Sequence, residues 1–143
     1  MVDILDAARY FVFLSYGRKQ YSLTPLKLQK ILYLAQGWSY VWDNHAAFPD
    51  EFEAWQYGPV NEKVYEEFKR YGRSEIPERE GIGFLRDFEV TETLTAIWDE
   101  YGKKTAYDLV ELTHQQKPWR DAYSQGTKIT NNSIKKYFQS TYF

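Results

Sequence analysis

The sequence lacks cysteine altogether and has only two histidines among its 143 residues. The absence of cysteine excludes disulfides, thiolate metal sites and a cysteine nucleophile, and it suits a reducing cytoplasm. The two histidines, His45 and His114, do not show a standard metal-ligand spacing. We therefore expect no metal and no other cofactor.

Long apolar runs are also missing. The longest, Tyr10–Leu14 and Ile31–Ala35, are far shorter than the roughly 20 residues that a membrane-spanning helix requires. Asp3 and Asp6 stand where a signal peptide would carry basic residues. The sequence therefore predicts a cytoplasmic protein without a membrane partner.

The chain has little net charge, with 18 basic against 20 acidic residues, which argues against binding of nucleic acid. The charges are nevertheless unevenly distributed. The stretch from Asp43 to Glu67 has a net charge of −6, whereas the stretch from Lys117 to Phe143 has a net charge of +4. Two interpretations remain open: ordinary solvated or mutually facing surfaces, or electrostatic steering of a protein partner.

Catalytic motifs are absent as well. There is no P-loop, no G-x-G-x-x-G, no G-x-S-x-G and no H-E-x-x-H. His114 lies on the apolar face of a predicted helix, where a hydrogen-bonded core histidine is the favoured interpretation over a general base. We therefore expect that the chain is not an enzyme.

Aromatic residues make up 19% of the chain, and apolar positions recur at helical spacing. The sequence predicts a mainly α, compact single domain over residues 1–143. Its centre is a buried helix over about 25–42, because Thr24 can cap it, Pro25 suits its first turn and its apolar residues occupy most sides. Helices are also expected over about 3–15, from Pro59 to Gly72, from Thr91, after Thr105, from Pro118 toward Tyr123, and after either Asn131 or Asn132.

A small two-stranded β element is possible over about 52–57 and 84–90, and the charged loop over 73–83 is predicted to be mobile. The segment 53–60 places Trp55 and Tyr57 before Gly58 and Pro59. A glycine followed by proline suits a rigid corner, and the exposed N–H groups of the expected helix start could also bind an anion. Tryptophan and tyrosine are preferred anchors of protein interfaces.

The aromatic residues fall into two groups. Trp38 and Trp98 lie in helical stripes and are expected in the core. The basic C-terminal stretch ends with Tyr142 and Phe143, which are expected either to form an interaction tail or to dock on the domain itself.

Four segments resemble the Panacea antitoxin domain family, which includes SocA-like antitoxins and phage-associated GepA-like proteins. They are LTPLKLQKILY at 23–33, AQGW at 35–38, FEAWQYGPV at 52–60 with Tyr65 downstream, and LTHQQKPW at 112–119 followed by Ala122 and Tyr123. The resemblance spans nearly the whole chain in the expected order.

The resemblance implies a helical antitoxin that neutralises a cognate toxin by direct binding. The toxin would be a small alarmone synthetase or another translation inhibitor. Alternative roles in the family are a proteolytic adaptor that delivers the toxin to a ClpXP-type AAA+ protease and a phage-encoded anti-defence protein. A nucleic-acid-binding regulator is the weakest alternative.

The resemblance supplies no catalytic residues, but its motif positions are candidates for partner binding. In this hypothesis Lys27 and Lys30 supply charge beside the anchors Trp55 and Tyr57. The full set of candidates is Lys27, Gln29, Lys30, Trp55, Tyr57, Gly58, Pro59, Tyr65, His114 and Trp119.

Overall fold

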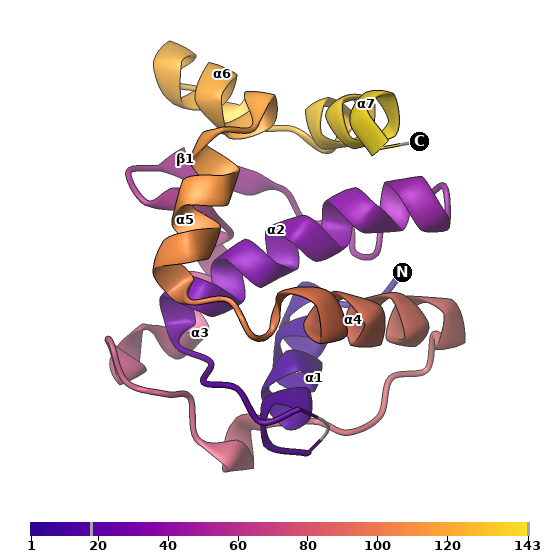
Figure 1. The fold of residues 1–143 in the computed structure, drawn as a ribbon, viewed down its shortest axis with the longest axis vertical. Coiled ribbons are helices and arrows are strands. Elements are labelled where there is room, and N and C mark those ends of the chain that lie inside the picture. Colours follow the sequence, from indigo (N-terminus) through magenta and orange to yellow (C-terminus); the bar gives the residue numbers. More distant parts are fainter. Residues whose placement is uncertain (18, 143) are drawn as a thin grey trace.

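The computed structural model describes residues 1–17 and 19–142, and it is mainly α-helical (Figure 1). Phe143, half of the expected C-terminal aromatic pair, lies outside the described residues. The helices are α1 (Ile4–Gly17), α2 (Pro25–Trp42), α3 (Glu62–Phe68), α4 (Phe88–Tyr101), α5 (Ala106–His114), α6 (Lys117–Gln125) and α7 (Asn131–Tyr142), with short 3₁₀ turns at Lys69–Tyr71 and Glu78–Glu80. In the described part of the chain, no helix is both long and apolar enough to cross a membrane.

Helix α2 is the centre of the core, as its sequence predicts. It begins at Pro25, and the side chain of Thr24 accepts a hydrogen bond from the amide of Lys27. Figure 1 shows α2 running between α4 and α7, and it also packs against α1, α3 and α5. Most of its residues are buried, including five polar ones: Lys27, Gln29, Lys30, Gln36 and Ser39.

The small sheet differs from the predicted one. Strand β1 (Phe52–Trp55) pairs antiparallel with β2 (Gly58–Val60) on one edge and with β3 (Lys128–Ile129) on the other. The prediction of a strand over 84–90 is wrong. Asp87 instead caps α4 by accepting a hydrogen bond from the amide of Val90, so the helix begins three residues before the expected Thr91.

The turn of the β1–β2 hairpin explains the missed strand. Gly58 has a φ of +110°, which reverses the chain at once and places Pro59 in β2. The prediction that Pro59 begins a helix is therefore wrong. Proline is tolerated in β2 because this strand lies at the edge of the sheet. Helix α3 begins only after Asn61, whose side chain accepts a hydrogen bond from the amide of Val64.

The segment between α3 and α4, which the sequence indicated to be mobile, is attached to α1 at several points. Arg9 donates a hydrogen bond to Glu80 at 2.5 Å, and the carbonyl of Arg9 accepts one from the amide of Ile82 at 3.1 Å. The hydroxyl of Tyr16 donates to the carbonyl of Ile76 at 2.7 Å. These contacts hold the charged segment against the helical core.

Helix α7 docks on the C-terminal half of α2 through aromatic rings. Phe138 is fully buried, and the ring of Tyr142 lies 4.8 Å from that of Trp38. Gly37 makes this contact possible, because a Cβ atom there would lie 2.4 Å from the ring of Phe138. Tyr142 therefore docks on the chain's own core, Trp38 is only partly buried, and Trp98 is fully buried as expected.

Candidate protein interface

An exposed aromatic groove lies between the start of α2, the β1–β2 hairpin and α3. We call it the aromatic groove. Its volume is about 460 Å³. Tyr57, Tyr65 and Leu26 are 58%, 41% and 38% exposed, which is unusual for large apolar side chains brought together. The lining residues are Pro25, Leu26, Gln29, Trp55, Gln56, Tyr57, Val60, Val64, Tyr65, Lys69 and Gly72.

Two of the three rings of the aromatic groove, those of Trp55 and Tyr65, are held in defined positions. Trp55 donates its indole N–H to a carboxylate oxygen of Glu53 at 2.9 Å, and its ring packs edge-on against Tyr65 at 4.9 Å. The ammonium group of Lys69 lies 5.9 Å from the centre of the Tyr65 ring. The groove therefore combines aromatic rings with a polar rim, where Lys69 pairs with Glu66 at 2.6 Å, and an apolar centre with a polar rim is the usual anatomy of a protein interface.

Two buried side chains of α2 form hydrogen bonds with the backbone of the hairpin and of the residue that follows it. Gln29 donates to the carbonyl of Asn61 at 3.0 Å and accepts from its amide at 2.9 Å. The ammonium group of Lys30 donates to the carbonyl of Pro59 at 3.0 Å. Lys30 is fully buried, and this desolvation lowers the pKa of its ammonium group to about 7.

Two rings near the α5–α6 junction hold the hairpin from the other side. His114 donates from Nε2 to the carbonyl of Gln56 at 3.0 Å, and Trp119 donates its indole N–H to the carbonyl of Trp55 at 2.8 Å. The two rings stack on each other at 4.1 Å. The hydrogen bonds of His114 and Trp119 therefore fix the turn that presents Tyr57.

Gly58 and Pro59 are buried beneath this turn. A Cβ atom at Gly58 would lie 2.6 Å from Cε of Lys30 and 3.0 Å from the hydroxyl oxygen of Thr113. The glycine is therefore required twice, for its positive φ and for the close approach of α2 and α5. The structural role of Gly58 agrees with the rigid corner that the sequence indicated.

The structure brings only part of the predicted site to the surface. Trp55, Tyr57 and Tyr65 share the aromatic groove, whereas neither Lys27 nor Lys30 supplies an exposed charge there. The ammonium group of Lys27 is buried, where it donates to the carbonyls of Ser22 at 2.8 Å and Gly102 at 2.5 Å and lies 5.4 Å from the Trp98 ring. Burial lowers its pKa to about 8.

Seven lining residues of the aromatic groove were not among the site candidates from the sequence: Pro25, Leu26, Gln56, Val60, Val64, Lys69 and Gly72. Two of them, Leu26 and Lys69, carried a signal in the sequence. Their signal is helical spacing: Leu26 lies three residues before Gln29 on α2, and Lys69 follows Tyr65 by four residues. Lys69 is the cation that the groove contains in place of the expected Lys27 and Lys30.

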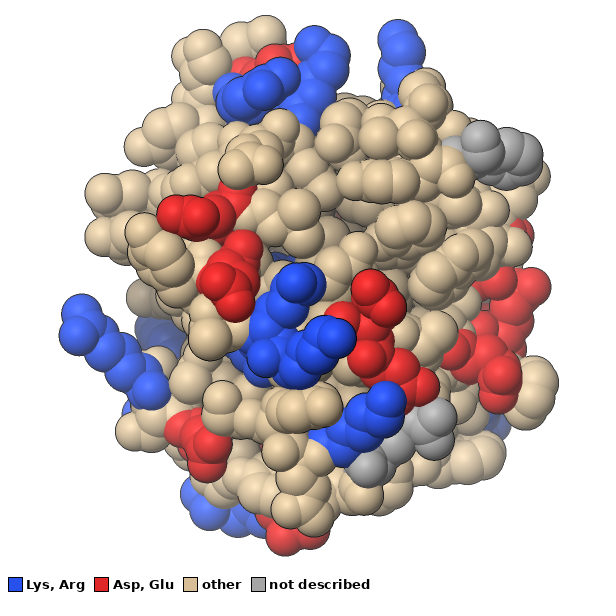
Figure 2. All heavy atoms as spheres, viewed as in Figure 1, with Lys and Arg blue, Asp and Glu red and all other residues tan. Residues whose placement is uncertain are grey.

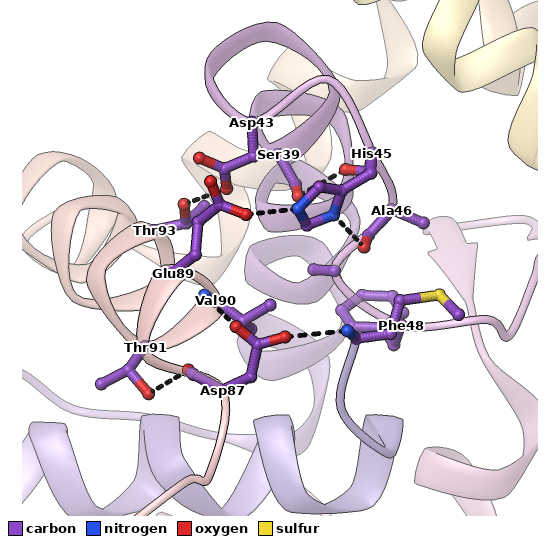
Figure 3. Close-up of polar contacts among 12 residues, drawn as sticks. Ser39, Asp43, His45, Ala46, Phe48, Asp87, Glu89, Val90, Thr91 and Thr93 are labelled. Carbon is purple, nitrogen blue, oxygen red and sulfur yellow. Dashed lines mark hydrogen bonds and ion pairs between the residues drawn. The ribbon is translucent and has the colours of Figure 1, made fainter.

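The other histidine serves a different contact (Figure 3). His45 donates from Nδ1 to the carbonyl of Ala46 at 2.9 Å and pairs through Nε2 with Glu89. These partners raise the pKa of His45, the Ala46 carbonyl most strongly. Its own carbonyl accepts a hydrogen bond from Ser39, so the loop after α2 is fastened to both α2 and α4. In the described residues, no group of three or more histidine, aspartate or glutamate side chains could hold a metal ion.

Comparison with known proteins identifies the family of this chain. A family model described as the antitoxin SocA-like Panacea domain matches residues 28–120. The chain belongs to this family. The matched Panacea segment contains the whole β1–β2 hairpin together with Gln29, Lys30, His114 and Trp119, which fasten it.

A curated relative agrees with this assignment. The antitoxin SocA of Caulobacter vibrioides (strain NA1000 / CB15N) is 30% identical to this Panacea-family chain over 109 residues. The aligned region covers 68% of this chain and 58% of the relative, so the chain spans less than two thirds of that protein's length. No solved structure matches the chain.

Proposed function

We propose that this chain is an antitoxin that neutralises a cognate protein toxin by direct binding, with the aromatic groove as the contact surface. Membership of the SocA-like family supports the antitoxin role. One structural observation supports the surface. Lys30, His114 and Trp119 donate hydrogen bonds to backbone carbonyls of the hairpin that carries the exposed ring of Tyr57, and Gln29 bonds the backbone of Asn61 directly after the hairpin.

An exposed ring on a backbone that other side chains hold in place suits protein binding. Interface anchors are typically large aromatic side chains held rigid before binding, because little conformational entropy is then lost. Tyr57 projects from a turn whose neighbouring carbonyls, those of Trp55, Gln56 and Pro59, are all engaged. The exposed ring is thus attached to a backbone that is already ordered. When the toxin binds over Tyr57 and Tyr65, the antitoxin would sterically block the functional surface of the toxin.

The test is co-expression with the product of the neighbouring open reading frame. The wild-type chain should restore growth and co-purify with a neighbour that is toxic alone. Tyr57→Ala combined with Tyr65→Ala should weaken binding by about 30-fold or more, since even one interface hot spot contributes roughly 2 kcal/mol. Tyr107→Ala is the matched control, because Tyr107 is 70% exposed on α5 and lies outside the groove.

Two results would refute the proposal. The antitoxin role fails if no neighbour is toxic or if the wild-type chain does not rescue growth. The assignment of the surface fails if the double variant, shown to be folded by its circular dichroism, binds as tightly as the Tyr107→Ala control. The half-life of the toxin separates the mechanisms, since masking leaves it unchanged or longer whereas a proteolytic adaptor would shorten it.

A further inference from the structure

A second groove, distinct from the aromatic groove, lies between α6 and α7. We call it the basic groove. Its volume is about 650 Å³. It shares no lining residue with the aromatic groove. The lining residues are Lys117, Pro118, Asp121, Ala122, Gln125, Thr127, Lys128, Thr130, Ser133, Lys136, Tyr137, Ser140 and Thr141.

The charge of the basic groove is positive. Three lysines line it against one acid, Asp121, which is paired with Lys117 at 2.7 Å. Lys128 also faces the carboxylates of Glu53 and Glu62. Lys136 makes no ion pair with any residue that the structure describes, and Lys135 flanks it along α7. Figure 2 shows lysine and arginine side chains at this end of the molecule, over α6 and α7, as well as on other parts of the same face.

The chemistry of the walls identifies the ligand class further. Between the lysines stand serine and threonine hydroxyl groups, which donate hydrogen bonds to carboxylates, and the apolar side chains of Pro118 and Ala122. Single-stranded nucleic acid would require stacking platforms. Among the described lining residues, Tyr137 is the one aromatic, and its ring packs edge-on against Phe138.

We infer that the basic groove binds an acidic segment of a protein partner, through Lys117, Lys128 and Lys136. This surface goes beyond the proposed function, because toxin masking by the aromatic groove does not require it. Most of the basic groove also lies beyond the matched family segment, which ends at residue 120.

The experiment uses the full chain labelled with ¹⁵N and a short fluorescein-labelled peptide in which glutamate alternates with leucine. The peptide should shift the amide signals of α6, of residues 127–130 and of α7, and its affinity should fall as salt rises. Lys117→Glu combined with Lys136→Glu should weaken binding by about tenfold or more. Lys103→Glu, at an exposed lysine outside the groove, is the control and should leave the affinity unchanged.

Several results would overturn the inference. One is a wild-type chain that does not bind the peptide. Another is equal binding of a peptide with glutamine in place of glutamate, which would show that charge does not matter. A third is an oligothymidylate that shifts the same amides at lower concentration, which would make the groove a nucleic-acid site. Since these measurements involve no toxin, their failure leaves the proposed antitoxin function untouched, and the reverse also holds.

Discussion

Lys30 makes the stability of this chain depend on pH in an unusual direction. Its side chain is fully buried, and its pKa falls from 10.5 to about 7 because burial desolvates the ammonium group. The unfolded chain therefore binds more protons than the folded chain between about pH 7 and 10.5. In this window the free energy of unfolding rises with pH, by up to about 1.4 kcal/mol per pH unit.

The size of this effect follows from the difference between the two pKa values of Lys30. A pKa lowered from 10.5 to about 7 corresponds to a cost of about 5 kcal/mol for burying the charged form. Lys30→Met removes this cost but leaves the carbonyl of Pro59 without its donor, which costs about 1–3 kcal/mol at every pH. The Met variant should therefore be more stable than the wild type at pH 6 and lose that advantage as the pH approaches 10.

The assay is urea unfolding followed by tryptophan fluorescence, which Trp98 in the core makes sensitive to folding. The quantity to plot is the difference in unfolding free energy between the Met variant and the wild type from pH 6 to 10. Other titrating groups, including Lys27, are present in both proteins and cancel in this difference. Lys103→Met, which replaces an exposed lysine, should follow the wild type. A difference that stays constant with pH would show that the pKa of Lys30 is not depressed and would refute the reasoning.

Three further predictions concern single contacts. Gly37→Ala should destabilise the chain by about 1–3 kcal/mol in thermal unfolding, although alanine favours helices, because its Cβ displaces the ring of Phe138; a rise in stability would contradict this. Hydrogen bonds, above all the one from Tyr71, lower the pKa of Glu80 to about 2. Glu80→Gln should therefore reduce the loss of stability on acidification below about pH 4.5, and acid unfolding curves that match the wild type would contradict this prediction. Glu89→Gln should lower the pKa of His45 in an NMR titration, and an unchanged midpoint would remove the proposed pairing.

The helices could be predicted from the sequence where a cap and a periodic apolar stripe coincide. Thr24 with Pro25 marks the start of α2, and Thr105 with Asp108 forms the capping box of α5. Both signals are local, because the capping hydrogen bonds join residues three apart. The core position of α2 was predictable for a related reason, since a helix that is apolar on most sides has to be buried.

The sheet was predicted only in part: β1 (Phe52–Trp55) confirms the strand expected over about 52–57, whereas β2 and β3 were missed. A positive φ at Gly58 allows a turn, but nothing local distinguishes a strand from a helix start at Pro59. Strand β3 has only two residues, and it forms because Lys128 and Ile129 meet β1 from more than 70 positions away. A pairing of this kind depends on how α5 and α6 pack, which no short-range pattern of residues encodes.

The candidate site shows the limit of arguing from residue type alone. Lysines are almost never fully buried without a partner, so Lys27 and Lys30 were natural choices for surface charges. Both instead donate to backbone carbonyls inside the chain. Three carbonyls of the hairpin likewise accept hydrogen bonds from long side chains on α2, α5 and α6. The ring of Tyr57, by contrast, remains exposed.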